Sequence, residues 1–112
     1  MKNYLDYPLE EPYYRSRATI NQKESYGRYV TPEERNLQSI NAARLYGTVK
    51  ASYEDMIRTL DFDISTGALQ SGTDEYYSRL AAINEKRAQL DDLEIEMHEA
   101  QTKKLEDITN HY

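Results

Sequence analysis

The feature that most constrains this chain is its C-terminal segment, Thr73 to Tyr112, which contains neither glycine nor proline. About half of its residues are Ala, Glu, Lys, Leu or Arg, a composition typical of long helices and coiled coils. Apolar side chains recur in it three, four or seven residues apart, which places them along one side of a helix. The pattern predicts a helix over about residues 73–110 with a packing seam, interrupted by Arg87, made of Leu80, Ile83, Leu90, Leu93 and Met97.

A second helix is indicated by the signal at its start, Thr31-Pro32-Glu33-Glu34. Thr31 can cap the helix, Pro32 fits the first helical position, and Glu34 can complete a capping box. Gly67 suits the left-handed conformation that often ends a helix. We therefore predict a helix over about 32–65 and a link over about 66–72. Its apolar stripe is expected to comprise Leu37, Ile40, Leu45, Val49, Tyr53, Met56, Leu60 and Ile64.

Large aliphatic side chains and phenylalanine are too scarce for a thick core. Leu, Ile, Val and Phe together make up 20 of the 112 residues, which is typical of elongated helical proteins or disorder. The net charge of −6 is too modest to force disorder by repulsion. We expect an all-α fold in which the two helices form a long antiparallel, coiled-coil-like hairpin. Because two packed helices leave the residues on either side of their apolar seam exposed to water, further stability must come from the N-terminal segment or from other chains.

Residues 1–30 are predicted to form an extended N-terminal arm, separate from the helical hairpin of residues 31–112. Six of the eleven tyrosines lie in this arm, and its few aliphatic residues follow no helical period. Pro8 and Pro12 bias the residues before them toward extended conformations. An arm of this kind becomes ordered only by lying on a partner or on its own helices.

The abundance of tyrosine in the arm indicates an interface. Tyrosine offers a large amphipathic contact area with only two side-chain torsions to freeze. We predict that a protein partner is bound by Tyr4, Tyr7, Tyr13, Tyr14, Arg15, Arg17, Tyr26 and Tyr29. Two alternatives stay open: Tyr13, Tyr14, Tyr26 and Tyr29 cover the hairpin of their own chain, or the run from Tyr13 to Arg17 stacks on nucleic-acid bases.

Composition argues against several other classes. The isoelectric point near 4.9 disfavours direct nucleic-acid binding, which needs clustered Lys and Arg. The absence of cysteine removes disulfides, thiol nucleophiles and thiolate zinc sites. No apolar run is long enough for a membrane helix or has the form of a signal peptide. These features predict no membrane association and a location in the cytoplasm or in a virion.

Candidate catalytic and metal-binding residues are sparse. The two histidines, His98 and His111, would lie about 20 Å apart on one helix, too far to share a site. A calcium loop starting at Asp61 fails because Thr66 replaces its glycine and Gly72 replaces its bidentate glutamate. We predict that the chain is not an enzyme and has no catalytic residue, cofactor or metal.

These observations favour a non-enzymatic structural or assembly protein that packs through a helical rod and a tyrosine-rich arm onto copies of itself or a larger scaffold. A virion component is suggested by analogy of shape. The alternative is a small acidic inhibitor of a host nucleic-acid enzyme, of the anti-defence or DNA-mimic type. Its acidic surface would comprise Asp91, Asp92, Glu94, Glu96, Glu99, Glu106 and Asp107. Basic residues interrupt this run, however, whereas a DNA mimic should have a negative electrostatic potential over its whole binding surface.

Overall fold

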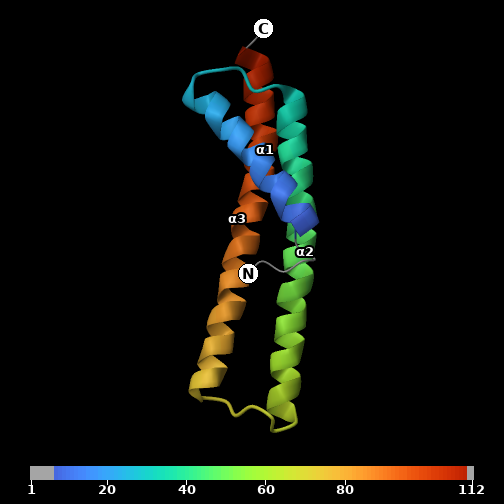
Figure 1. The fold of residues 1–112 in the computed structure, drawn as a ribbon, viewed down its shortest axis with the longest axis vertical. Coiled ribbons are helices and arrows are strands. Elements are labelled where there is room, and N and C mark those ends of the chain that lie inside the picture. Colours follow the sequence, from blue (N-terminus) through green and yellow to red (C-terminus); the bar gives the residue numbers. More distant parts are fainter. Residues whose placement is uncertain (1–6, 111–112) are drawn as a thin grey trace. The chain divides into compact units, whose positions relative to one another are not determined.

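The computed structural model describes residues 7–110, with side chains from residue 11 onward, and it contains three helices and no strand in that range. The helices are α1 (Tyr7–Ser25), α2 (Pro32–Ser65) and α3 (Asp74–Asn110) (Figure 1). The described residues fall into two compact units. We call residues 7–46 with 93–110 the three-helix unit and residues 47–92 the two-helix unit. The predicted all-α class is confirmed, and α2 and α3 pack closely as in a hairpin within each unit.

Residues 7–25 are helical, so the prediction of an extended arm is wrong for this part of the chain, while residues 1–6 of that arm lie outside the described residues. In α1, Pro8 occupies the first turn, where a backbone N–H has no helical acceptor, and the helix continues through Pro12. Tyr13 and Ile20, seven residues apart, are both buried and define one helical face. This tertiary burial overrides the weak local pattern. α1 ends in a Schellman motif in which Gly27 has a φ of +68° and the Arg28 N–H donates to the Lys23 carbonyl at 2.8 Å.

The start of α2 forms the predicted capping box. The Glu34 N–H donates to Thr31 Oγ1 at 3.1 Å, and the Thr31 N–H donates to Glu34 Oε1 at 3.0 Å. Lys23 of α1 donates to the same carboxylate at 2.7 Å. The hydrogen bonds from Lys23 and from the Thr31 backbone lower the pKa of Glu34. The cap of α2 is therefore also a contact with α1.

The core of the three-helix unit draws side chains from all three helices and from the loop after α1. Two alanines are completely or almost completely buried in it, Ala42 of α2 and Ala100 of α3. The predicted stripe is wrong at the start of α2, because Leu37 and Ile40 are exposed. The buried apolar residues of this unit are Tyr13, Ile20, Val30, Ala42, Leu45, Leu93 and Ala100.

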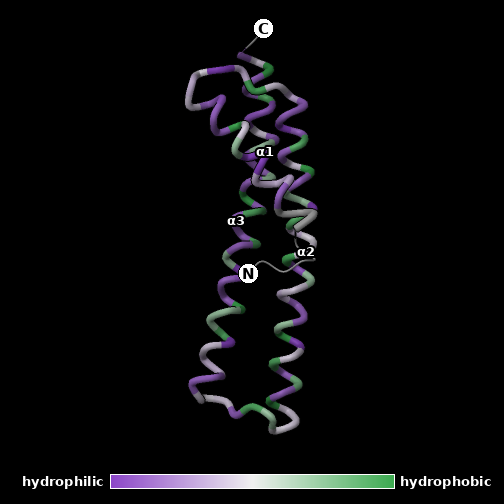
Figure 2. Tube along the Cα trace, viewed as in Figure 1, coloured by the Kyte–Doolittle hydropathy of each residue, from purple (hydrophilic) through white to green (hydrophobic). Residues whose placement is uncertain are grey.

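The two-helix unit has its own apolar cluster. Leu60 of α2, Leu69 of the link and Ile83 of α3 are buried together. Partly buried Tyr53, Met56, Ile57, Ile64, Tyr76 and Leu80 pack against them. Arg79 donates to Asp63 at 2.8 Å, which adds a polar contact between the helices. Figure 2 shows short hydrophobic stretches alternating with hydrophilic ones along α2 and α3, as expected for helices with one packed side.

Candidate functional site

The predicted tyrosine interface is divided by the structure. Tyr13 is buried, whereas Tyr14, Tyr26 and Tyr29 are exposed. Arg15 and Arg17 are exposed on α1. Tyr4 lies outside the described residues, as does the side chain of Tyr7.

Tyr13 makes an intramolecular contact. Its side chain is 4% exposed, and its hydroxyl donates a hydrogen bond to Glu96 of α3. Arg17 Nη1 donates to the same hydroxyl at 3.4 Å. Burial, together with the hydrogen bond and charge of Glu96, raises the pKa of Tyr13 to about 12. Tyr13 therefore covers a helix of its own chain, in contrast to the exposed Tyr14, Tyr26 and Tyr29.

Glu96 joins all three helices of the three-helix unit. Gln38 Nε2 of α2 donates to Glu96 Oε1 at 3.0 Å, while Tyr13 of α1 occupies the other carboxylate oxygen. Asn41 of α2 adds a hydrogen bond of 3.3 Å to the backbone carbonyl of Pro12. Glu96, expected on the acidic outer surface, is instead part of the packing between helices.

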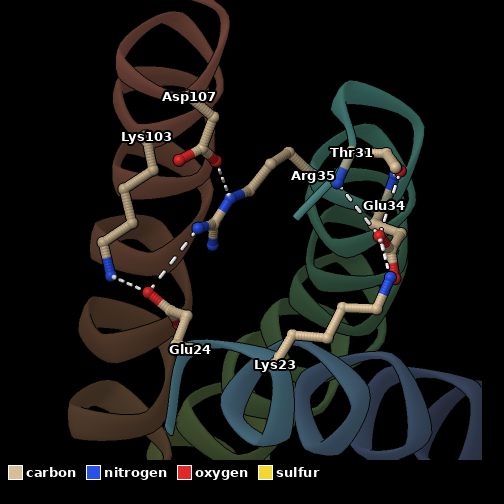
Figure 3. Close-up of polar contacts among 7 residues, drawn as sticks. All are labelled: Lys23, Glu24, Thr31, Glu34, Arg35, Lys103 and Asp107. Carbon is tan, nitrogen blue, oxygen red and sulfur yellow. Dashed lines mark hydrogen bonds and ion pairs between the residues drawn. The ribbon is translucent and has the colours of Figure 1, made fainter. Parts of the chain in front are cut away.

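Arg35 forms a second connection between the three helices (Figure 3). The side chain of Arg35 is 3% exposed, and its Nε donates to Asp107 Oδ2 of α3 at 2.9 Å. Its Nη2 lies 3.5 Å from Glu24 Oε2 of α1, and Lys103 Nζ lies 3.6 Å from the same oxygen. A buried guanidinium thus holds the start of α2 against the ends of α1 and α3. We call Arg35, Glu24, Lys103 and Asp107 the arginine cluster.

A stripe predicted from the aliphatic residues alone does not include Arg35. Counting back from buried Val49 and Leu45 in alternating steps of three and four leads to Ala42, Gln38 and Arg35. All three face the helices packed against α2. The heptad phase was therefore the signal that could have identified Arg35. Aliphatic Leu37 and Ile40 lie outside this phase.

The predicted seam of α3 is distributed over both units. Ile83 and Leu90 are buried in the two-helix unit, and Leu80 there is partly buried. Leu93 is buried and Met97 partly buried in the three-helix unit. Arg87, expected within this stripe, is exposed, so the apolar face passes beside it.

A groove lies between α1 and α2 in the three-helix unit. It has a volume of about 550 Å³. Arg15 donates to Glu11 across one turn of α1 at 2.6 Å, and both are exposed to solvent at the groove. Leu37 of α2 contributes an apolar surface that is 51% exposed. The groove is lined by Glu11, Pro12, Arg15, Ser16, Thr19, Leu37, Asn41 and Arg44.

The outer face of α3 carries acidic residues around one exposed apolar side chain. Ile95 is 56% exposed, and Glu94, His98 and Glu99 near it are exposed as well. Glu99 and His98 lie four and three residues beyond Ile95, which places them beside it on the helix surface. This face points away from buried Leu93, because two residues correspond to about 200° of helical turn.

Neither a metal site nor a similarity to a known protein indicates a function for the described residues. Within residues 7–110 no group of three or more His, Cys, Asp or Glu side chains could hold a metal ion. None of the three described helices has an apolar stretch long enough to cross a membrane. Comparison of the chain with protein-family models, curated proteins and solved structures finds no significant match.

Proposed function

We propose that the chain is a non-enzymatic structural or assembly protein whose helices pack onto copies of itself or onto a larger scaffold. The observation that carries the proposal is the amount of apolar surface left uncovered. Nine large apolar side chains within the described residues are exposed, whereas Ile20 and Leu45 are the largest that are fully buried. Completing the burial of an aliphatic side chain that is about half exposed, such as Leu37 at 51% or Ile95 at 56%, is worth roughly half of the 1.5–3 kcal/mol that full burial gives. Association would therefore gain apolar burial that the single chain lacks.

The exposed apolar residues lie on both units, and no single cleft gathers them. They are Tyr14, Tyr26, Tyr29, Leu37, Ile40, Phe62, Tyr77, Ile95 and Leu105. Contact along helical surfaces suits this distribution better than capture of a small molecule, which needs a concave and largely enclosed pocket. Assembly into a virion is one setting for such a protein, and this part of the proposal rests on analogy of shape alone.

The test is the mass of the full chain in solution, measured by light scattering after size exclusion over a concentration series. We expect a mass that exceeds 13.1 kDa and rises with concentration. A mass equal to that of one chain at every concentration would refute self-assembly. Removing residues 1–30 is unsuitable as a test, because it would uncover the core residues that pack against Tyr13 and Ile20.

The alternative function, a small acidic inhibitor of a nucleic-acid enzyme, is supported by the exposed carboxylates on α3. Asp91, Asp92 and Glu94 are exposed and lie within a run of four residues. Glu96 and Asp107 accept hydrogen bonds from Tyr13 and Arg35 of the same chain, so the acidic surface left for a partner is shorter than the sequence suggests. Lysine substitution of the three exposed residues should abolish inhibition by such a mimic while leaving the fold intact. A chain that remains a monomer and binds a basic partner through them would favour this alternative.

A further inference from the structure

We propose that α1 is a releasable cover of the three-helix unit, which detaches from α2 and α3 as one segment when the glutamates that hold it lose their charge. Residues 47–92 stay folded during this change. The inference concerns a conformational change within one chain and does not depend on the proposed self-assembly.

The apolar attachment of α1 is small. Among the α1 side chains that the structure describes, Tyr13 and Ile20 are the buried ones. A helix of 19 residues with a proline inside it is marginally stable on its own in water. α1 therefore needs further contacts to stay helical and in place.

Two polar contacts of α1 end on glutamates of the other helices. The Tyr13 hydroxyl donates a hydrogen bond to Glu96 of α3. Lys23 Nζ donates to Glu34 Oε1 of α2 at 2.7 Å (Figure 3). Hydrogen bonds to an ionised carboxylate are roughly twice as strong as those between neutral groups. Protonation of Glu96 or Glu34 therefore weakens the attachment of α1.

A third contact uses a glutamate of α1 itself. Glu24 Oε2 lies 3.5 Å from Arg35 Nη2 of α2 and 3.6 Å from Lys103 Nζ of α3 (Figure 3). Both ion pairs are lost when Glu24 is neutral, whereas the hydrogen bond from Arg35 to Asp107 joins α2 to α3 without α1. Loss of charge on Glu24 thus acts on α1 and leaves this contact between the other two helices. The hydrogen bond from Asn41 to the Pro12 carbonyl does not depend on a carboxylate and cannot replace the three contacts.

The groups around the three glutamates give the direction of the pH dependence. The contacts are with donors and cations: Tyr13, which Arg17 also contacts, and Gln38 at Glu96; Lys23 and Thr31 at Glu34; Lys103 and Arg35, which Asp107 shares, at Glu24. The hydrogen bonds from Lys23 and from the Thr31 backbone hold the pKa of Glu34 below its usual range. The stabilisation from Glu34 is therefore complete above the ordinary pKa of a glutamate, about 4.3, and is lost as the pH falls through the lower value in the folded chain. α1 is attached at neutral pH and released in acid.

The two-helix unit does not share this dependence on the three glutamates. Leu60, Leu69 and Ile83 form its buried cluster, and apolar burial does not change with the charge of a carboxylate elsewhere. The ion pair of Arg79 with Asp63 involves none of the three glutamates. Neutralising them should therefore release α1 and leave residues 47–92 folded.

The test is hydrogen exchange of the full chain at neutral pH, followed by mass spectrometry, in a variant that combines Glu24→Gln, Glu34→Gln and Glu96→Gln. Glutamine keeps the shape of glutamate and, at position 34, can still take part in the capping box. We expect the protection of residues 11–25 to fall by about tenfold or more relative to the parent chain, while residues 53–90 keep theirs.

The matched control combines Glu33→Gln, Glu94→Gln and Glu99→Gln, which remove the same charge at exposed positions. This control should leave the protection of α1 unchanged. Acidification of the parent chain from neutral pH to about pH 4 should expose α1 before residues 53–90, after correction for the intrinsic pH dependence of exchange. The control variant should keep this response to acid, and the triple variant should lack it.

Unchanged protection of α1 in the triple variant would refute the proposal, because apolar contacts would then suffice to hold the helix. An equal loss of protection in residues 11–25 and 53–90 would refute it as well, because the chain would then unfold as a whole. A similar loss in the control would show that net charge, and not these three contacts, holds α1. None of these results depends on the mass of the chain, so failure of the proposed self-assembly is distinguishable from failure of this inference.

Discussion

The arginine cluster gives the sharpest prediction about stability, tested by the substitution Arg35→Met. Removing one partner of a fully buried ion pair typically costs about 3–5 kcal/mol. Here the carboxylates left behind keep contact with water, since the side chain of Asp107 is 24% exposed and that of Glu24 is 39% exposed. We therefore expect a loss of about 2–3 kcal/mol in the free energy of unfolding. For a chain of this size the melting temperature should fall by roughly 10 °C or more.

The matched control for this prediction is Arg58→Met. Arg58 lies 3.7 Å from Asp55, and both side chains are 73% exposed. An ion pair so open to solvent contributes about 0.5 kcal/mol or less. Urea unfolding followed by circular dichroism gives both values, and a double-mutant cycle of Arg35→Met with Asp107→Asn isolates their coupling. Equal effects of the two arginine substitutions would refute the view that the cluster stabilises the three-helix unit.

Substitutions at four further positions test local features of the fold. Tyr13→Phe should cost about 1 kcal/mol at neutral pH by removing the hydrogen bond to Glu96. The pKa of Tyr13 is about 12 in the folded chain against 10.0 ordinarily, so the parent chain should lose stability from pH 10 toward pH 12, as the unfolded state alone releases this proton. Tyr13→Phe should lack this component in urea unfolding across that range, and an unchanged pH dependence would contradict the burial of the hydroxyl. Thr31→Ala should cost about 0.5–2 kcal/mol by removing the cap of α2, while Thr31→Ser should retain most of it in thermal melting. Gly67→Ala should destabilise by about 1 kcal/mol because φ is +82° there, whereas Gly47→Ala, inside α2 with open space around a new Cβ, should stabilise by a similar amount. Shifts of the same sign for the two alanines would contradict this backbone assignment.

Local signals made α2 and α3 predictable from the sequence. The capping residues Thr31 and Glu34 and the left-handed Gly67 act within a few residues of the helix ends that they define. The absence of glycine and proline from α3 likewise acts locally. These features need no knowledge of what the helices pack against.

The helical state of α1 could not be predicted in this way because it depends on tertiary contacts. Among the α1 side chains that the structure describes, Tyr13 and Ile20 are the buried ones, and two prolines argue against a helix when the segment is considered alone. The hydrogen bond from Tyr13 to Glu96 joins residues that are 83 positions apart. No spacing rule within residues 1–30 identifies such a partner.

The candidate interaction surfaces were only partly foreseen for the same reason. The tyrosine content indicates an interface, but it does not distinguish Tyr13, which is buried in the folded chain, from Tyr14, which is exposed. The groove combines Arg15 of α1 with Leu37 of α2, and these meet only once α1 folds against α2. Leu37 was expected in the core because it is aliphatic, although its position falls outside the heptad phase of Leu45.

The most direct test of the central claim, assembly through exposed helical surfaces, is analytical ultracentrifugation of the unmodified full chain over a wide range of concentration and at two ionic strengths. We predict a mass that increases with concentration at both ionic strengths, because the burial of exposed apolar side chains is not weakened by screening of charges. A single species with the mass of one chain at all concentrations, in low and high salt alike, would contradict the account.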